Sequence, residues 1–165
     1  MNAGAAVAEG DILLFLHADS VLPEDAYAAV TQALARAEVS ATGFRLRMDR
    51  PEWRYRMLTN IGTFRFRIQR TFFGDQALAV RRRDFERLGG YRALDLMEDV
   101  DLSIRLRRLG QLELLASHVT TSARRFEHGG MLRTLMLMSA LQVAYSAGVS
   151  AERLSRWYGD GRSTN

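Results

Sequence analysis

Two polar residues with the chemistry of metal ligands or of acids and bases follow an apolar segment near the start of the chain. His17 and Asp19 come directly after residues 12–16, five apolar residues without polar alternation. Such a run is typical of a strand that is covered on both faces, as in a parallel sheet. Functional groups in open α/β sheets gather beyond the carboxyl ends of such strands. We therefore expect both side chains to reach one small site. The alternative is that Asp19 with Ser20 only begins a turn or caps the next helix.

A second acidic group stands where a helix is predicted to begin. It comprises Glu98, Asp99 and Asp101. Carboxylates in the first turn of a helix face unpaired backbone N–H groups and the positive end of the helix dipole, which favours their ionised form. An ionised carboxylate directed into a cleft can act as a general base. Helix starts are also often acidic for stability alone, so the residue chemistry leaves both interpretations open.

The composition is that of a single globular domain. The chain has 165 residues, of which 47% are hydrophobic, enough for one core. The absence of cysteine excludes disulfides, thiolate zinc sites and a cysteine nucleophile. All 23 basic residues are arginine, which excludes a Schiff-base lysine and the lysine of a P-loop. The net charge of +4 is mild and, without a docking motif, does not indicate nucleic-acid binding.

Helical and strand patterns alternate along the chain, which predicts a mixed α/β sheet flanked by helices. We predict strands at residues 11–16, 40–48, 77–80 and 111–120, helices at 2–9, 23–37, 52–70, 84–88 and 98–109, and a helical tail at 130–159. Residues 40–48 alternate in polarity and should be half exposed. Asp84 should cap its helix, and Asp101 and Arg105, four residues apart, should pair on the outside of theirs.

Six short stretches along the chain form an ordered set. They are residues 2–5 (Asn-Ala-Gly-Ala), 10–19 (Gly-Asp-Ile-Leu-Leu-Phe-Leu-His-Ala-Asp), 74–76 (Gly-Asp-Gln), 85–91 (Phe-Glu-Arg-Leu-Gly-Gly-Tyr), 98–102 (Glu-Asp-Val-Asp-Leu) and 121–126 (Thr-Ser-Ala-Arg-Arg-Phe). Together they resemble a family 2 glycosyltransferase with the Rossmann-like GT-A fold, in a bacterial branch of small transferases. No single stretch is specific, but the ordered set is fairly specific and covers nearly all of the chain.

The resemblance implies an inverting, hexosyltransferase-like enzyme that moves a sugar from a nucleotide-diphosphate sugar to an acceptor hydroxyl. Asp19 matches the last aspartate of the family's Asp-x-Asp motif, which binds a divalent metal, Mg or Mn, against the diphosphate. His17 replaces the first aspartate of that motif. Imidazole still binds manganese, so His17 is the second candidate ligand and the main departure from the family.

The resemblance also assigns roles to residues further along the chain. Asp99 matches the aspartate of the family's Glu-Asp motif, the general base that takes the proton of the acceptor hydroxyl, and Glu98 would assist it. Other residues would surround the substrates. Gly74, Asp75 and Gln76 would line the acceptor side, and Arg124 and Arg125 would contact the diphosphate or close a loop over it.

The start of the chain lacks segments that the family has. Family members begin with a strand and loop that receive the nucleotide base, followed by two further strand–helix steps, and Met1 matches a position well inside this pattern. We therefore expect residues 1–165 to be one domain that is the C-terminal portion of a glycosyltransferase domain, from a truncated or mis-started copy. Nucleotide affinity should be greatly reduced, and residues 1–165 alone should show no measurable transfer.

Two other classes of function stay open. Residues 52–70 and 131–149 combine arginines with aromatic and leucine-type residues, which favours a non-catalytic membrane-surface or partner-binding module. Nucleotidyl transfer also uses metal-binding carboxylates, but the sequence has no glycine-rich phosphate loop. For the transferase we expect a nucleotide-sugar donor, a sugar or lipid-linked acceptor and no nucleic acid as partners. Its expected location is the cytoplasm, with peripheral contact at the inner face of the cell membrane.

Overall fold

A computed structural model describes residues 1–160, without the side chains of residues 125, 128, 129, 131, 132, 159 and 160. The chain divides into two compact units. The first unit comprises Met1–Tyr91 and Asp99–Ala123, and the second comprises Arg92–Glu98 and the chain from Arg124 onward. Each unit is described by itself below.

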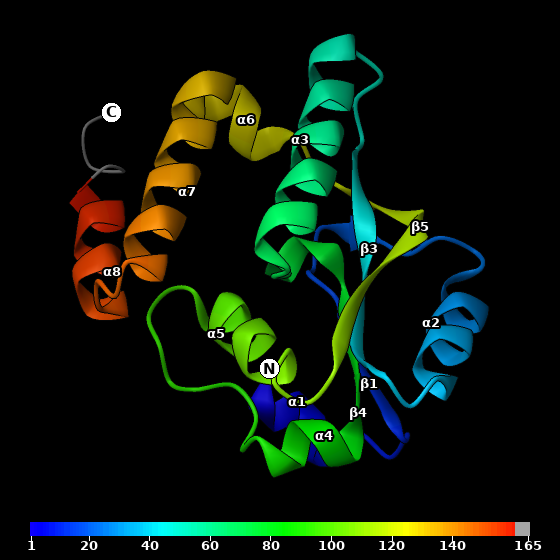
Figure 1. Ribbon diagram of the computed structural model, residues 1–165. Helices are drawn as coiled ribbons and strands as arrows, with labels where there is room; N and C mark the ends of the chain where they lie inside the picture. Colours follow the sequence, from blue (N-terminus) through cyan, green and yellow to red (C-terminus); the bar gives the residue numbers. More distant parts are fainter. Residues whose placement is uncertain (161–165) are drawn as a thin grey trace. The chain divides into compact units, whose positions relative to one another are not determined.

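The first unit is built on one five-stranded sheet with the strand order β1-β4-β3-β5-β2 (Figure 1). The strands are β1 (Ile12–Phe15), β2 (Ser20–Val21), β3 (Val39–Met48), β4 (Leu78–Arg81) and β5 (Gln111–Thr121). β3 and β5 run parallel, whereas β1 with β4, β3 with β4 and β2 with β5 are antiparallel. The predicted mixed α/β class is confirmed.

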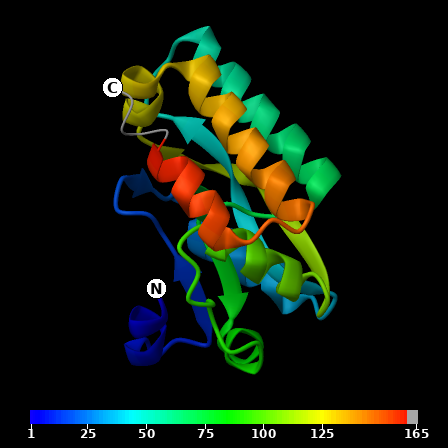
Figure 2. The same cartoon turned by 90° about the vertical axis from the view of Figure 1, so that its left-hand side faces the viewer.

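Helices cover both faces of this sheet (Figure 1). Helix α2 (Ala26–Ala35) packs on one face. The other face carries α1 (Asn2–Val7), α3 (Trp53–Gln69), α4 (Arg82–Arg87) and α5 (Glu98–Leu106). A 3-10 turn, η1 (Gly74–Gln76), leads into β4. In the second unit, α6 (Arg124–Gly129) is followed by α7 (Met131–Ser146) and α8 (Ala151–Asp160), which lie side by side (Figure 2).

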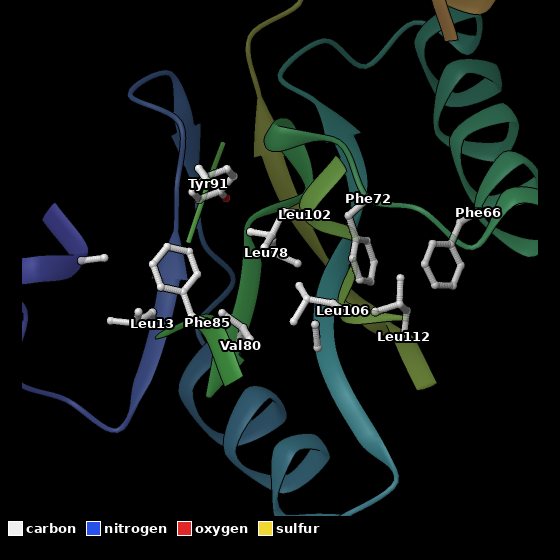
Figure 3. Packing of buried hydrophobic residues seen from close by; sticks show 12 residues of the cluster. Leu13, Phe66, Phe72, Leu78, Val80, Phe85, Tyr91, Leu102, Leu106 and Leu112 are labelled. Atoms are coloured by element: carbon white, nitrogen blue, oxygen red, sulfur yellow. The ribbon is translucent and has the colours of Figure 1, made fainter. Parts of the chain in front are cut away.

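An aromatic and aliphatic cluster fills the space between the sheet and the larger helical layer (Figure 3). The rings of Phe15, Phe85 and Tyr91 contact one another with centroids 5.0 to 5.7 Å apart. Phe66 of α3 stacks on Phe72 at 4.8 Å. Because each such buried side chain stabilises a fold by about 1.5–3 kcal/mol, this cluster holds α3, α4 and α5 against the strands.

Strand β1 confirms one part of the expectation and corrects another. Leu13 and Phe15 pack into the cluster on one face, and Ile12 and Leu14 pack against the α2 side, so the strand is covered on both faces as predicted. Its partner β4 runs antiparallel, so the expected parallel pairing is wrong. The physical reason is that an apolar run reports burial on two faces and carries no information on the direction of the neighbouring strand.

Strand β3 is more buried than its alternating sequence predicted. Its first six residues are buried, and partial exposure begins only at Arg45. The strand lies between β4 and β5 and has helices on both of its faces. Central position in the sheet therefore overrides the exposure that the local pattern indicates.

Two acidic residues also differ from the predictions. Asp84 lies within the first turn of α4, after an N-cap at Arg81, and pairs with that arginine at 3.2 Å. Asp101 and Arg105 form their pair at 2.7 Å, but both side chains are buried instead of facing out. Arg105 also donates to the carbonyl of Leu88 at 2.9 Å. This carbonyl, just after α4, draws the ion pair inward, and a helical pattern alone cannot reveal it.

The burial of the Asp101–Arg105 pair has a measurable consequence. We expect Asp101→Ala to lower the free energy of unfolding by about 3–5 kcal/mol, because Arg105 is left buried without its counter-charge. The control Glu113→Ala removes the partner of Arg36 in a more exposed ion pair and should cost less than about 1 kcal/mol. Urea unfolding near neutral pH measures both, and equal losses would contradict the buried placement.

Candidate functional site

Three of the predicted site residues, from distant parts of the sequence, meet at the turn before β4. His17 follows β1, Gly74 begins η1, and Asp99 lies in the first turn of α5. A Cβ atom added to Gly74 would overlap Nε2 of His17 and would lie 3.5 Å from Oδ2 of Asp99. Both side chains therefore rest against the bare Cα of Gly74. This explains in physical terms why residue 74 is glycine.

Backbone donors fix the orientation of the Asp99 carboxylate. Its Oδ2 atom accepts a hydrogen bond from the N–H of Gly74, and its Oδ1 atom accepts one from the N–H of Val100 at 2.7 Å. Two backbone N–H groups, one from η1 and one from α5, therefore hold the position of the Asp99 carboxylate.

A cation that the sequence analysis did not single out lies beside this carboxylate. The guanidinium carbon of Arg65, from α3, lies 3.5 Å from the centre of the Phe73 ring. Burial lowers the pKa of Arg65 to about 10, while the charges of Asp75 and Asp99 act to raise it. Arg65 is therefore cationic at neutral pH. One feature of the sequence could have indicated that Arg65 faces inward. It follows Leu58, which is buried, by seven residues and therefore lies on the same side of the helix.

The residues of η1 do not share one role. Asp75 is half-buried and lies in the field of Arg65. Gln76 is only 2% exposed, and both ends of its amide are used. Its Oε1 accepts from the N–H of Phe73 at 3.1 Å, and its Nε2 donates to the carbonyl of Phe44 at 3.4 Å. Gln76 thus holds the turn to β3, and its expected role on the acceptor side stays a prediction.

Asp19 lies in the exposed turn between β1 and β2, where the N–H of Ser20 donates to the carbonyl of His17 at 3.1 Å. The side chains of His17 and Asp19 are both exposed in this turn. Among the described residues, no group of three or more His, Cys, Asp or Glu side chains is arranged to hold a metal ion. A metal bound here would take further ligands from a phosphate, as Mg²⁺ commonly does.

The other predicted site residues belong to the second unit. Glu98 is half-buried and is the first residue of α5, directly before Asp99. Arg124 is exposed and begins α6. The side chain of Arg125 lies outside the described residues. The roles expected for these three residues stay predictions.

His118 lies in β5 opposite Arg45. Burial, followed by the charges of Arg47 and Arg45, lowers its pKa below the ordinary value of 6.5. A histidine among arginines is a poor cation ligand because it sits in a positive field. This environment supports a structural role.

Comparison with known proteins leaves the family of the chain unassigned. A scan against models of protein families finds no match, and a search of curated proteins finds no significant match. In the part of the chain that the structure describes, every helix is too short or too polar to cross a membrane. A proposal for function therefore rests on the residues and geometry described above.

The packing at Gly74 can be tested by adding one methyl group. We expect Gly74→Ala to push the exposed His17 ring aside and to remove the nuclear Overhauser contact between that ring and the residue 74 backbone. Stability should change by less than about 1.5 kcal/mol, because a side-chain end and not backbone must move. The control Gly62→Ala lies in α3 with open space around it, so it should keep the contact. A persistent contact in Gly74→Ala would show that His17 does not rest on Gly74.

Proposed function

We propose that this chain carries the catalytic and acceptor side of an inverting glycosyltransferase of the family 2, GT-A type. One observation carries the proposal: His17, Gly74 and Asp99 meet at one turn. His17 and Gly74 are more than fifty residues apart in the sequence. These are three of the positions to which the sequence resemblance assigns a metal ligand, the acceptor side and the general base.

In the proposed reaction, an oxygen of Asp99 accepts the proton of the acceptor hydroxyl. The acceptor oxygen attacks the anomeric carbon of the donor sugar and forms the new glycosidic bond. On the opposite face, the bond between that carbon and the diphosphate oxygen breaks, and its electron pair leaves with the diphosphate. The anomeric configuration is therefore inverted. The N–H groups of Gly74 and Val100 would keep the base oriented during this step.

Arg65 gives the proposed base a suitable electrostatic environment. The Arg65 cation interacts with the charges of both Asp75 and Asp99. We propose that Arg65 thereby holds the Asp99 carboxylate in position. Its Phe73 partner limits how far the guanidinium can move.

The exposed turn after β1 would hold a divalent metal, Mg or Mn. His17 and Asp19 offer one imidazole nitrogen and one carboxylate oxygen, a donor set that manganese accepts. When bound, the metal would neutralise charge on the departing diphosphate. His17 also contacts Gly74 beside Asp99. A metal bound by His17 and the proposed base Asp99 would therefore act on the same substrate.

The partners in this proposal are a nucleotide-sugar donor and a sugar or lipid-linked acceptor. The chain has no cysteine, which is compatible with a reducing cytoplasm. We propose a cytoplasmic location, at the inner face of the cell membrane where the acceptor is carried by a lipid.

The donor side of the proposal can be tested on the chain as it is. With Mn²⁺ and uridine diphosphate together, we expect paramagnetic broadening of the backbone amide signals of residues 16–20 and Gly74. This readout detects weak as well as tight binding. Asp19→Asn should abolish the broadening, because it removes the anionic ligand.

Two control variants separate metal binding from general effects of charge. Asp11→Asn, which removes an exposed carboxylate before the other end of β1, should bind like the wild type. Asp99→Asn should also retain the broadening, since it removes the proposed base and not a proposed ligand. Broadening that survives in Asp19→Asn, or that is missing in the wild type at saturating Mn²⁺, would contradict the proposal.

A further inference from the structure

Helix α3 carries a second apolar face that lies outside the core. Its inner side is buried through Tyr55, Leu58 and Phe66. The other apolar residues recur every three or four positions and form a stripe along the helix, which we call the α3 stripe: Trp53, Met57, Ile61, Phe64 and Ile68. These side chains are between 41% and 70% exposed. The stripe extends over about 22 Å of helix, so it is a continuous surface and not one stray residue.

Arginines border the stripe on both sides. Residues 53–69 contain four arginines and no acidic residue. At about 100° per residue, Arg54 lies on one side of the stripe, and Arg56 and Arg67 lie on the other. All three are exposed, whereas Arg65 is half-buried beside Asp75 and Asp99. The outer side of α3 is therefore apolar along its middle and cationic along both edges.

We propose that α3 lies on the surface of an anionic lipid membrane, with the α3 stripe in the interfacial layer and Arg54, Arg56 and Arg67 at the headgroups. Aromatic residues such as Trp53 favour the membrane interface. Arginine can lay its apolar stem along a buried surface while its charged head stays in water. A helix with an apolar stripe between basic edges has the pattern of an interfacial helix.

Charge distinguishes this occupant from a second copy of the chain. Two α3 stripes placed face to face would bring two sets of arginines together. Of the three bordering arginines, Arg54 has Glu52, just before the helix, as an ion-pair partner at 3.7 Å. Helix α3 itself has no carboxylate for Arg56 and Arg67, so such a contact would bring these cations of the two copies together without compensation. Anionic headgroups supply the missing negative charge. The proposal concerns the outer side of α3 and does not depend on sugar transfer.

Vesicle binding tests the proposal. The probes are vesicles of phosphatidylcholine with about 30% phosphatidylglycerol, compared with vesicles of phosphatidylcholine alone. We expect cosedimentation with the anionic vesicles that weakens as salt is added. In Trp157→Phe, which leaves Trp53 as the only tryptophan, the emission should shift to shorter wavelength on binding.

Substitutions with matched controls locate the binding surface. Phe64→Ser combined with Ile68→Ser should weaken binding at least about tenfold, because two large apolar side chains lose their burial in the interface. Val21→Ser combined with Tyr27→Ser removes two apolar side chains elsewhere that are at least as exposed, at 67% and 83%, and should leave binding unchanged.

The charge component has its own pair of variants. Replacing the three bordering arginines with glutamine should also weaken binding at least about tenfold. The control replaces three exposed arginines that lie elsewhere, Arg83, Arg87 and Arg108, and should have a much smaller effect.

Several outcomes would overturn the proposal. Wild-type binding by the stripe variant, or an equal loss in either control, would place the membrane contact elsewhere or make it unspecific. A stripe variant that changes a dimer into a monomer, while vesicle binding stays the same, would identify an interface between copies. If the stripe variant does not fold, the Trp53 emission decides, because an unchanged spectrum with anionic vesicles excludes the contact.

Discussion

The hydrogen bond from the N–H of Gly74 to the Asp99 carboxylate ties the turn before β4 to the start of α5. The close contact of His17 with this turn requires that residue 74 has no side chain, since a Cβ there would enter the space of His17. Two segments 25 residues apart are thus joined at one point, and His17 is held beside them. The arrangement of the candidate site follows from this close approach.

The core around the sheet supplies the rigidity that such an approach needs. Phe72, directly before the turn, is fully buried and stacks on Phe66, and its N–H donates to the hydroxyl of Ser103 in α5 at 3.0 Å. Gln76 fixes the other end of the turn to β3. Helix α3 connects this support to two surfaces, because Phe66 faces the core, Arg65 faces the site and the α3 stripe faces outward.

The sequence predicted the kinds of elements well and their surroundings less well. Apolar periodicity located α3, β3, β4 and β5 to within a few residues, because the spacing of apolar residues follows the repeat of a helix or a strand. It could not give the antiparallel partner of β1, which depends on chain direction. It also placed the Asp101–Arg105 pair outside, because the carbonyl of Leu88 that binds Arg105 comes from the turn after α4. In the site, motif order identified His17, Gly74 and Asp99, but Arg65 belongs to no motif and became visible only in three dimensions.

A crystal structure of the chain with Mn²⁺ and uridine diphosphate, measured at the manganese absorption edge, would examine the proposed site as a whole. We expect one anomalous peak within coordination distance of Asp19 and His17, with the diphosphate bound to the metal on the side that faces Asp99. A manganese ion bound away from both residues, or a diphosphate bound where Asp99 cannot reach the attached sugar, would contradict the assignment of this turn to sugar transfer.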